Sequence, residues 1–339
     1  MDDRLITLPD SDFIKEFLQV KTEKDTLSTQ LYVDGHIDLP YFMMKYAPDM
    51  TFDELDKGPF TPELARQSGV RFFATAIYCQ DKFNGDSSFG HFQENLDFAV
   101  RHMENVLHVK GISDIDSLKE EKAKLGTIFL LENADALADN TRHIHRLREE
   151  NIFIVGLTHA GTNRLADGNT ATHSDGITPE GREVIHILTK NNILIDVAHL
   201  HSNCFWQLLG LVEKPIISSH TGIRDICSIP RNINMEQVKE IVERGGVVGI
   251  TFNPEMLSLD KDADIDLIFR HLDKVVQKYG VDFVGMGSDF CGFDVPAHGM
   301  EDITGTRDLI ELMSSHGYNK DDINKIMGLN WLRIYEKIF

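Results

Sequence analysis

Eight short runs of apolar and β-branched residues recur along the chain, and stretches with helical spacing of apolar residues lie between them. Near-continuous apolar runs are typical of strands that are buried on both faces of a parallel sheet. The predicted strands are 31–37, 70–78, 127–131, 152–158, 193–198, 215–219, 246–252 and 282–288. Eight strands alternating with helices predict an α/β fold, a closed (β/α)8 barrel of the TIM type. An open doubly wound sheet is the alternative, but it usually carries a glycine-rich phosphate turn after its first strand, and this chain has none there.

Helical spacing is clearest at 92–108, 140–150, 179–190, 234–244 and 264–279. Pro179 suits the first turn of a helix, and Gly280 suits a helix end. The tail from about 320 to 339 is predicted to be a helix packed on the barrel through Leu329, Trp331, Leu332 and Ile334. Because barrels of this kind commonly exceed 200 residues, we expect one domain spanning 1–339.

The chain is acidic, with 54 Asp and Glu against 34 Lys and Arg and a formal net charge of −20. This balance argues against nucleic acid or an anionic membrane as a partner, because phosphate binding needs a basic face. No run approaches the ~18 apolar residues of a membrane span, and the first residues lack the apolar core of a secretory signal. The four cysteines form no Cys-x-x-Cys pair, which favours free thiols in a reducing compartment. We therefore expect a cytoplasmic protein.

Polar side chains follow six of the eight predicted strands. In a barrel these positions surround one mouth, where barrel enzymes keep their active sites. The residues are His36 and Asp38 at the end of the first strand, then Glu132, His159, His199, His220 and Asp289 at the ends of later strands. His36 and Asp38 are two positions apart and therefore point to the same face of a strand.

Imidazole and carboxylate are the usual non-thiol ligands of Zn²⁺. Three histidines, one Asp and one Glu from this set already exceed the needs of one tetrahedral ion and fit two ions that share a carboxylate. A water between the ions would then be the nucleophile, because metal binding lowers its pKa to roughly 7. Any one of these histidines alone is more often an ordinary hydrogen-bonded residue, and a lone Glu can cap a helix. Six polar strand ends together favour a functional site, since carboxylates are rarely buried unpaired.

Eight longer segments extend this pattern along the chain. They are DGHIDLP at 34–40, LLENADAL at 130–137, GLTHAGTNRLAD at 156–167, GITPEG at 176–181, LIDVAHLH at 194–201, PIISSHTGIRDICSIPRNI at 215–233, VGMGSDF at 284–290 and NWLRIYE at 330–336. In this order they resemble the membrane (renal) dipeptidase family, peptidase family M19, whose members are amidohydrolase-like metallopeptidases. The resemblance covers residue 31 to the C-terminus.

The resemblance implies a role for each matching residue. His36 and Asp38 match the ligands of one zinc ion, and Glu132 matches the bridging carboxylate. His199 and His220 match the ligands of the second ion. The three residues that match substrate contacts are His159 for the scissile carbonyl, Arg231 for the free carboxylate, and Asp289 for the amino end and proton transfer.

Two departures from the family's pattern bear on side-chain specificity. Cys291 stands where the family often has a second Asp, and the loop after the seventh strand has Phe252 and Asn253 where a tyrosine is common. Neighbouring Arg224 is predicted to be exposed, with no role.

The expected function is zinc-dependent hydrolysis of free dipeptides, including Xaa-D-Xaa, by a hydroxide that bridges two ions. The resemblance also implies a homodimer. One alternative is a metal-dependent hydrolase of N-acyl amino acids or lactams, which would need no site for a free amino group. Another is a barrel that binds small peptides without turnover.

Overall fold

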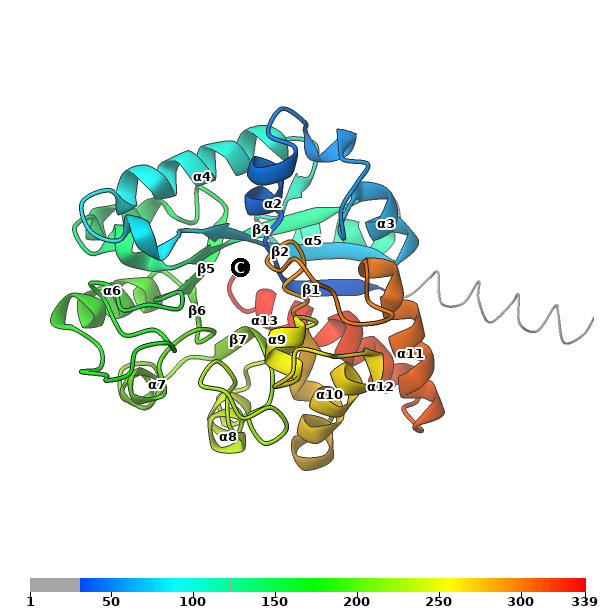
Figure 1. Cartoon of the computed structure of the whole chain (residues 1–339). Helices are drawn as coiled ribbons and strands as arrows, with labels where there is room; N and C mark the ends of the chain where they lie inside the picture. Colours follow the sequence, from blue (N-terminus) through cyan, green and yellow to red (C-terminus); the bar gives the residue numbers. More distant parts are fainter. Residues whose placement is uncertain (1–30, 122–123) are drawn as a thin grey trace, which may run out of the picture.

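The protein is described by a computed structural model that covers residues 31–121 and 124–339. Parallel strands form the centre of the molecule and helices surround them (Figure 1). The N-terminal segment, on which the expectation about a secretory signal rests, lies outside the described residues. The prediction of one domain over 1–339 stays a prediction.

Within the described residues the sheet has nine parallel strands, eight of which close into a ring. β1 pairs with both β2 and β9, and β2 pairs with β4. The short β3 pairs only with the first residues of β4 and so stands outside the ring. The strands are β1 Tyr32–Ile37, β2 Val70–Tyr78, β3 Leu107–His108, β4 Gly126–Glu132, β5 Ile152–Gly156, β6 Leu194–Asp196, β7 Ile216–Thr221, β8 Val248–Ile250 and β9 Val284–Met286. The predicted (β/α)8 barrel is therefore confirmed.

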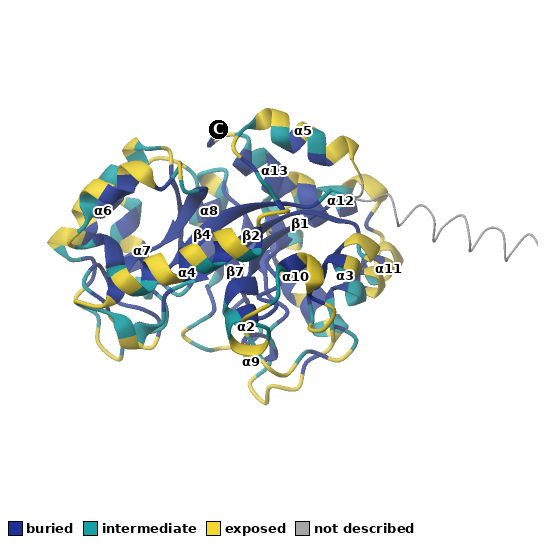
Figure 2. Ribbon diagram, turned by 90° about the horizontal axis from the view of Figure 1, so that it is seen from above, coloured by how far each residue is buried: buried dark blue, intermediate teal, exposed yellow. Residues whose placement is uncertain are grey.

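Helices cover the outside of the ring, with buried faces toward the strands and exposed faces outward (Figure 2). The α-helices are α2 Leu39–Tyr46, α3 Pro62–Gln67, α4 Ser88–His102, α5 Ile112–Glu120, α6 Pro179–Lys190, α7 Ser202–Leu209, α8 Met235–Glu243, α9 Pro254–Leu257, α10 Ile265–Tyr279, α11 Thr306–Ser315, α12 Lys320–Asn324 and α13 Asn330–Tyr335. Short 3-10 turns lie at Phe52–Glu54, Asp81–Phe83, Ala134–Leu137, Thr141–Arg146, Val281–Phe283 and Ile303–Gly305.

Pro179 and Gly280 correctly predicted where α6 begins and where α10 ends. The Thr178 side chain caps α6 by accepting from the Gly181 amide, and Gly280 ends α10 with φ 84°. Two other helix predictions were wrong in extent. The helix predicted at 92–108 is α4, which ends at His102, and the segment predicted at 140–150 forms only a 3-10 turn. Helical spacing of apolar residues therefore continued past the point where the chain turns back to the sheet.

The tail consists of α12, a π-helical turn at Lys325–Leu329 and α13 rather than one helix. Trp331 is fully buried, and its indole Nε1 donates to the Met286 carbonyl at 2.8 Å. A Cβ atom on Gly35, Gly249 or Gly285 would lie 2.3, 3.0 or 2.4 Å from the Trp331 side chain. The indole thus occupies space left by three glycines on β1, β8 and β9. The expected packing of Leu329 was wrong, because that side chain is 45% exposed.

Candidate metal centre and substrate pocket

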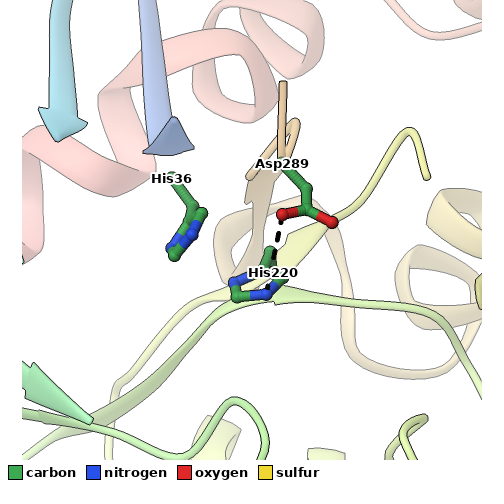
Figure 3. A group of neighbouring side chains, drawn as sticks. All are labelled: His36, His220 and Asp289. Atoms are coloured by element: carbon green, nitrogen blue, oxygen red, sulfur yellow. Dashed lines mark ion pairs between the residues drawn. The ribbon is translucent and has the colours of Figure 1, made fainter. Parts of the chain in front are cut away.

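The carboxyl ends of the strands bring all eight predicted side chains to one place. Six of them line a pocket of about 400 Å³, namely Asp38, Glu132, His159, His199, Arg231 and Asp289. The other two, His36 and His220, are buried directly against it, with ring centroids 3.9 Å apart. Figure 3 shows His36, His220 and Asp289 converging from three separate strand ends. The barrel mouth therefore carries one site and not scattered polar residues.

The nitrogen and oxygen atoms at this site form overlapping groups that could hold metal ions. His36, Asp38 and Glu132 make one group, and Glu132, His199 and His220 make a second. His36 and His220 also form a group with Asp289. Within each group the potential ligand atoms lie within 4.8 Å of one another. Glu132 belongs to two groups, as a carboxylate shared by two ions would.

The distances between potential ligand atoms support Glu132 as a carboxylate shared by two ions. Glu132 Oε1 lies 2.9 Å from His199 Nε2, whereas Glu132 Oε2 lies 3.8 Å from His36 Nε2. His36 Nε2 is also 3.3 Å from Asp38 Oδ2, but it is buried and makes no hydrogen bond of good geometry among the described residues. His199 Nε2 and His220 Nε2 face each other at 3.1 Å. Paired imidazole nitrogens that converge beside carboxylate oxygens fit the donor preference of Zn²⁺.

Burial and neighbouring charges together shift the pKa values of these residues. Burial raises the pKa of Asp289, and the charge of Asp38 raises it further, to about 8. Burial alone would lower the pKa of His36, but Asp38 and Glu132 outweigh it and raise that pKa to about 10. Burial and nearby positive charge hold the pKa values of His199 and His220 well below the ordinary value. The neutral rings of His199 and His220 leave a lone pair for a metal cation, whereas a cation bound by His36 would replace the proton that Asp38 and Glu132 hold there.

His159 is held by an aspartate that the sequence analysis missed. Its Nδ1 lies 3.0 Å from Asp81 Oδ2, and the same oxygen accepts from the Gly161 amide at 3.0 Å. The imidazole ring lies between Tyr78 and His199, with centroids 4.8 and 4.5 Å away. Asp81 follows β2 in a 3-10 turn, so the rule that polar residues directly follow strands did not select it. The only signal in the sequence was a polar loop after a strand, which is common.

Arg231 presents unsatisfied donors to the pocket. Its Nη2 donates to the His220 carbonyl at 3.1 Å, while Nε and Nη1 are buried without a hydrogen-bond partner among the described residues. The preceding loop is tied by Arg224, which donates from Nε to the Ile229 carbonyl and from Nη2 to the Pro230 carbonyl. Arg224 is half-buried, so the prediction of an exposed residue with no role was wrong.

The two positions that depart from the family's pattern differ in their surroundings. Asn253 Nδ2 donates to Asp289 Oδ2 at 2.9 Å, whereas Phe252 is fully buried in the core. Cys291 is buried beside the site and lines a neighbouring cavity of about 740 Å³. Gly292 approaches so closely that a Cβ atom there would lie 2.4 Å from Asp38 Oδ2. Asn253 and the glycine therefore fix where the carboxylates lie.

Comparison with known proteins adds to this geometry. The sequence pattern of the membrane dipeptidase family, peptidase family M19, matches residues 20–338. The chain belongs to this family. It is a metallo-dipeptidase, as the resemblance implied. Membership of this metallopeptidase family implies a metal cofactor.

Individual relatives are distant in sequence, and the solved structures among them are similar in fold. Dipeptidase 3 of Mus musculus is 22% identical over 318 residues, which are 90% of this chain and 64% of the mouse protein. This chain thus matches less than two thirds of that relative. A solved M19 structure, the metallopeptidase called dipeptidase AC, has a TM-score of 0.83 at 21% identity and covers 91% of this chain and 98% of its own. A metallopeptidase from Rhodobacter sphaeroides, solved with a phosphinate mimic of L-Ala-D-Ala, has a TM-score of 0.79 at 21% identity and covers 91% and 99%.

Beneath the metal groups of this M19 chain lies a layer of buried polar residues. Asp34 accepts from the Tyr32 hydroxyl at 2.7 Å and from the amides of His36 and Ser288 at 3.1 and 2.9 Å. Asp196 Oδ1 accepts from the amides of Ala198 and Ser219 at 3.0 and 2.8 Å. These bonds hold the ends of β1, β6, β7 and β9 at fixed positions below the ligands.

Two residues of the site have left-handed backbone conformations. His199 has φ 63° and Asp289 has φ 64°, and neither is a glycine. Such conformations are uncommon for ordinary residues and persist where the surroundings impose them. They turn the chain sharply after β6 and β9, which directs both side chains into the mouth. No helix of the described residues is long and apolar enough to cross a membrane.

Proposed function

We propose that this M19 enzyme binds two zinc ions and hydrolyses the peptide bond of free dipeptides, including Xaa-D-Xaa. The observation that carries the proposal is Glu132, whose two oxygens face imidazoles of two different ligand groups. His36 and Asp38 would hold one ion and His199 and His220 the other, with Glu132 shared. When bound, zinc supplies Lewis acidity and a water acidic enough to act as a nucleophile at neutral pH.

The chain's own residues would bind both ends of the substrate. The free Nε and Nη1 donors of Arg231 suit a carboxylate, which a guanidinium can bind through two parallel hydrogen bonds. Asp289, held by Asn253, offers a carboxylate for the ammonium end and is placed to pass a proton to the leaving nitrogen. Because both charged ends are then recognised, longer peptides and blocked dipeptides should be poor substrates.

His159 would stabilise the carbonyl oxygen as negative charge develops there. Asp81 holds the Nδ1 side of its ring, which leaves Nε2 for the substrate. The phosphinate bound to the Rhodobacter relative mimics a dipeptide with a D-residue at its C-terminal end, and it supports including such substrates here.

The test is a panel of L-L, L-D and N-acetylated dipeptides given to the purified protein with zinc and after chelation. We expect cleavage of the free dipeptides only, and only with metal. Cleavage of the acetylated compounds at equal rates would contradict recognition of the amino end. His36→Ala, His199→Ala and His220→Ala should each lower bound zinc and activity together, and a fully active variant with normal zinc would contradict its ligand role.

We also propose a homodimer in a cytoplasmic location. The resemblance to the family supports the dimer, and four buried free cysteines are consistent with a reducing compartment. Light scattering of the purified protein tests whether it is a homodimer, because a measured mass near the monomer value of 38.4 kDa would contradict the dimer.

A further inference from the structure

A single serine on β7 lies between imidazoles of the two proposed metal sites. Ser219 Oγ is 2.9 Å from His220 Nδ1 and 3.3 Å from His36 Nδ1. All three residues are buried, with exposed fractions of 1% or less. The inference drawn from this contact rests on the proposed function, because it assumes that both histidines bind metal.

The hydrogen-bonding capacity of a serine hydroxyl limits what this contact can be. A hydroxyl has one proton to donate and can accept two hydrogen bonds. Buried Asp196 lies next to Ser219 and accepts its backbone amide at 2.8 Å. The Ser219 oxygen can accept from both histidines at once. In that arrangement His36 and His220 both carry their proton on Nδ1.

Protonation of Nδ1 determines what the other ring nitrogen can do. A neutral imidazole with hydrogen on Nδ1 has a lone pair on Nε2, and that lone pair binds metal. His36 Nε2 faces Asp38 and Glu132, and His220 Nε2 faces His199. Both Nε2 atoms therefore point into the ligand groups, on the side of each ring opposite to Ser219.

We propose that Ser219 is a positioning residue that sets the tautomer and ring orientation of one ligand in each metal site. Asp196 holds the Ser219 backbone in place by accepting its amide. Since the same oxygen serves His36 and His220, removing it would weaken both sites at once. This coupling distinguishes Ser219 from a residue that supports only one histidine, such as Asp81 beside His159.

Neighbouring Ser218 provides a matched control on the same strand. It is also fully buried, but its hydroxyl has no hydrogen-bond partner among the described residues. Ser218→Ala therefore removes the same atom from the same strand without removing a hydrogen bond to a ligating histidine. Ser219→Thr keeps the hydroxyl and tests whether the chemistry or only the packing matters.

The experiment titrates metal-free protein with zinc against a competing chelator and counts the ions bound. Ser219→Ala should lose roughly tenfold to hundredfold in affinity at both sites, the usual cost of removing a hydrogen-bond partner of a ligating histidine. Ser218→Ala should bind zinc like the wild type, and Ser219→Thr should recover most of the affinity. Nitrogen NMR of labelled histidines in the metal-free protein should show Nδ1 protonation of the neutral His220 ring in the wild type and its loss in Ser219→Ala.

The outcomes separate this inference from the function on which it rests. If wild-type protein binds no zinc, the proposed metal centre fails and the inference fails with it. If wild-type and Ser219→Ala protein bind two ions equally well, the centre stands and the positioning role is wrong. Equal losses in Ser218→Ala and Ser219→Ala, or no recovery in Ser219→Thr, would also overturn it, because packing would then explain the effect.

Discussion

At the scale of single residues, the site depends on contacts that the strand pattern does not reveal. The seven polar residues after strand ends were identifiable because each follows an apolar run. Asp81, Arg224 and Asn253 act from loops, where sequence spacing does not determine what a side chain contacts. Their partners are set by how neighbouring loops pack at the barrel mouth, and this packing is a tertiary property.

Asp81→Asn should reduce turnover by about tenfold to a hundredfold, since small misplacements of a catalytic group have effects of that size. The amide oxygen could accept from the His159 ring and the Gly161 amide as Oδ2 does, but the change removes the negative charge beside the ring and turns an NH2 group toward the Asn133 side-chain amide, which donates to Asp81 Oδ1 at 3.4 Å. Zinc content should stay unchanged, because Asp81 belongs to none of the ligand groups. The measurement is kcat together with bound zinc. Asp86→Asn, an exposed change in the same loop, is the control, and equal activity of the two variants would remove Asp81 from the mechanism.

Arg231→Ala should raise KM for free dipeptides by roughly a hundredfold, because a desolvated charge pair contributes about 2–5 kcal/mol. Its unpaired Nε and Nη1 donors are the groups that the substrate carboxylate would satisfy. Dipeptide amides, which lack that carboxylate, should lose far less. Steady-state kinetics on paired acids and amides tests the assignment. A loss of the same size on both series would show that Arg231 only supports the loop.

At the scale of elements, the apolar runs located the eight barrel strands but not their ends. The prediction for β2 matches its observed bounds, whereas the predicted 246–252 shrinks to Val248–Ile250 in β8. Apolar residues continue beyond the paired segment because loops at the mouth are also buried, as Thr251 and Phe252 are. The short β3 was predicted as helix because Met103 and Val106 continue an apolar spacing after α4 ends.

Helix α10 is joined to the loop after β7 and to α9 by a buried histidine. His271 Nδ1 accepts from the Ile223 amide at 2.8 Å, and Nε2 donates to the Leu257 carbonyl at 3.1 Å. Protonation of Nδ1 would break the first bond. Burial lowers the pKa of His271 to about 4, against about 6.5 in an unfolded chain.

Because the folded pKa lies below the unfolded one, this contribution to stability is complete above pH 6.5 and falls as the pH drops toward 4. The loss should be about 3 kcal/mol, since each pKa unit corresponds to about 1.4 kcal/mol. Urea unfolding of metal-free protein between pH 7 and 4 measures it. His271→Gln should show a shallower pH dependence than wild type. His173→Gln, at a largely exposed position, should follow the wild type, and parallel curves for all three proteins would contradict the prediction.

At the scale of the whole molecule, the tail completes the barrel. Trp331 fills the space beside Gly35, Gly249 and Gly285, so Trp331→Ala should cost about 3–5 kcal/mol of unfolding free energy. Chemical unfolding of the metal-free protein tests this value. Trp206→Ala, which removes an indole that is 42% exposed, should cost far less, and similar losses in both variants would show that the barrel does not depend on the tail.

The sequence predicted that Trp331 packs on the barrel, and the family resemblance included its segment. It could not show which glycines make room for the indole, because Gly35, Gly249 and Gly285 are distant from it or from one another along the chain. Contacts of this kind follow from ring closure, where the first strand meets the last. Closure of the strand ring cannot be predicted from any single segment of the sequence.

The contact between Trp331 and Gly35 cannot form until almost the whole chain has been synthesised. The two residues are separated by about 300 positions, and ribosomes add roughly 5–20 residues per second. The first strand therefore leaves the ribosome roughly 15–60 seconds before the side chain that covers it exists. During that interval its apolar residues are open to wrong partners, so the yield of folded enzyme should depend on the rate of translation and on chaperones.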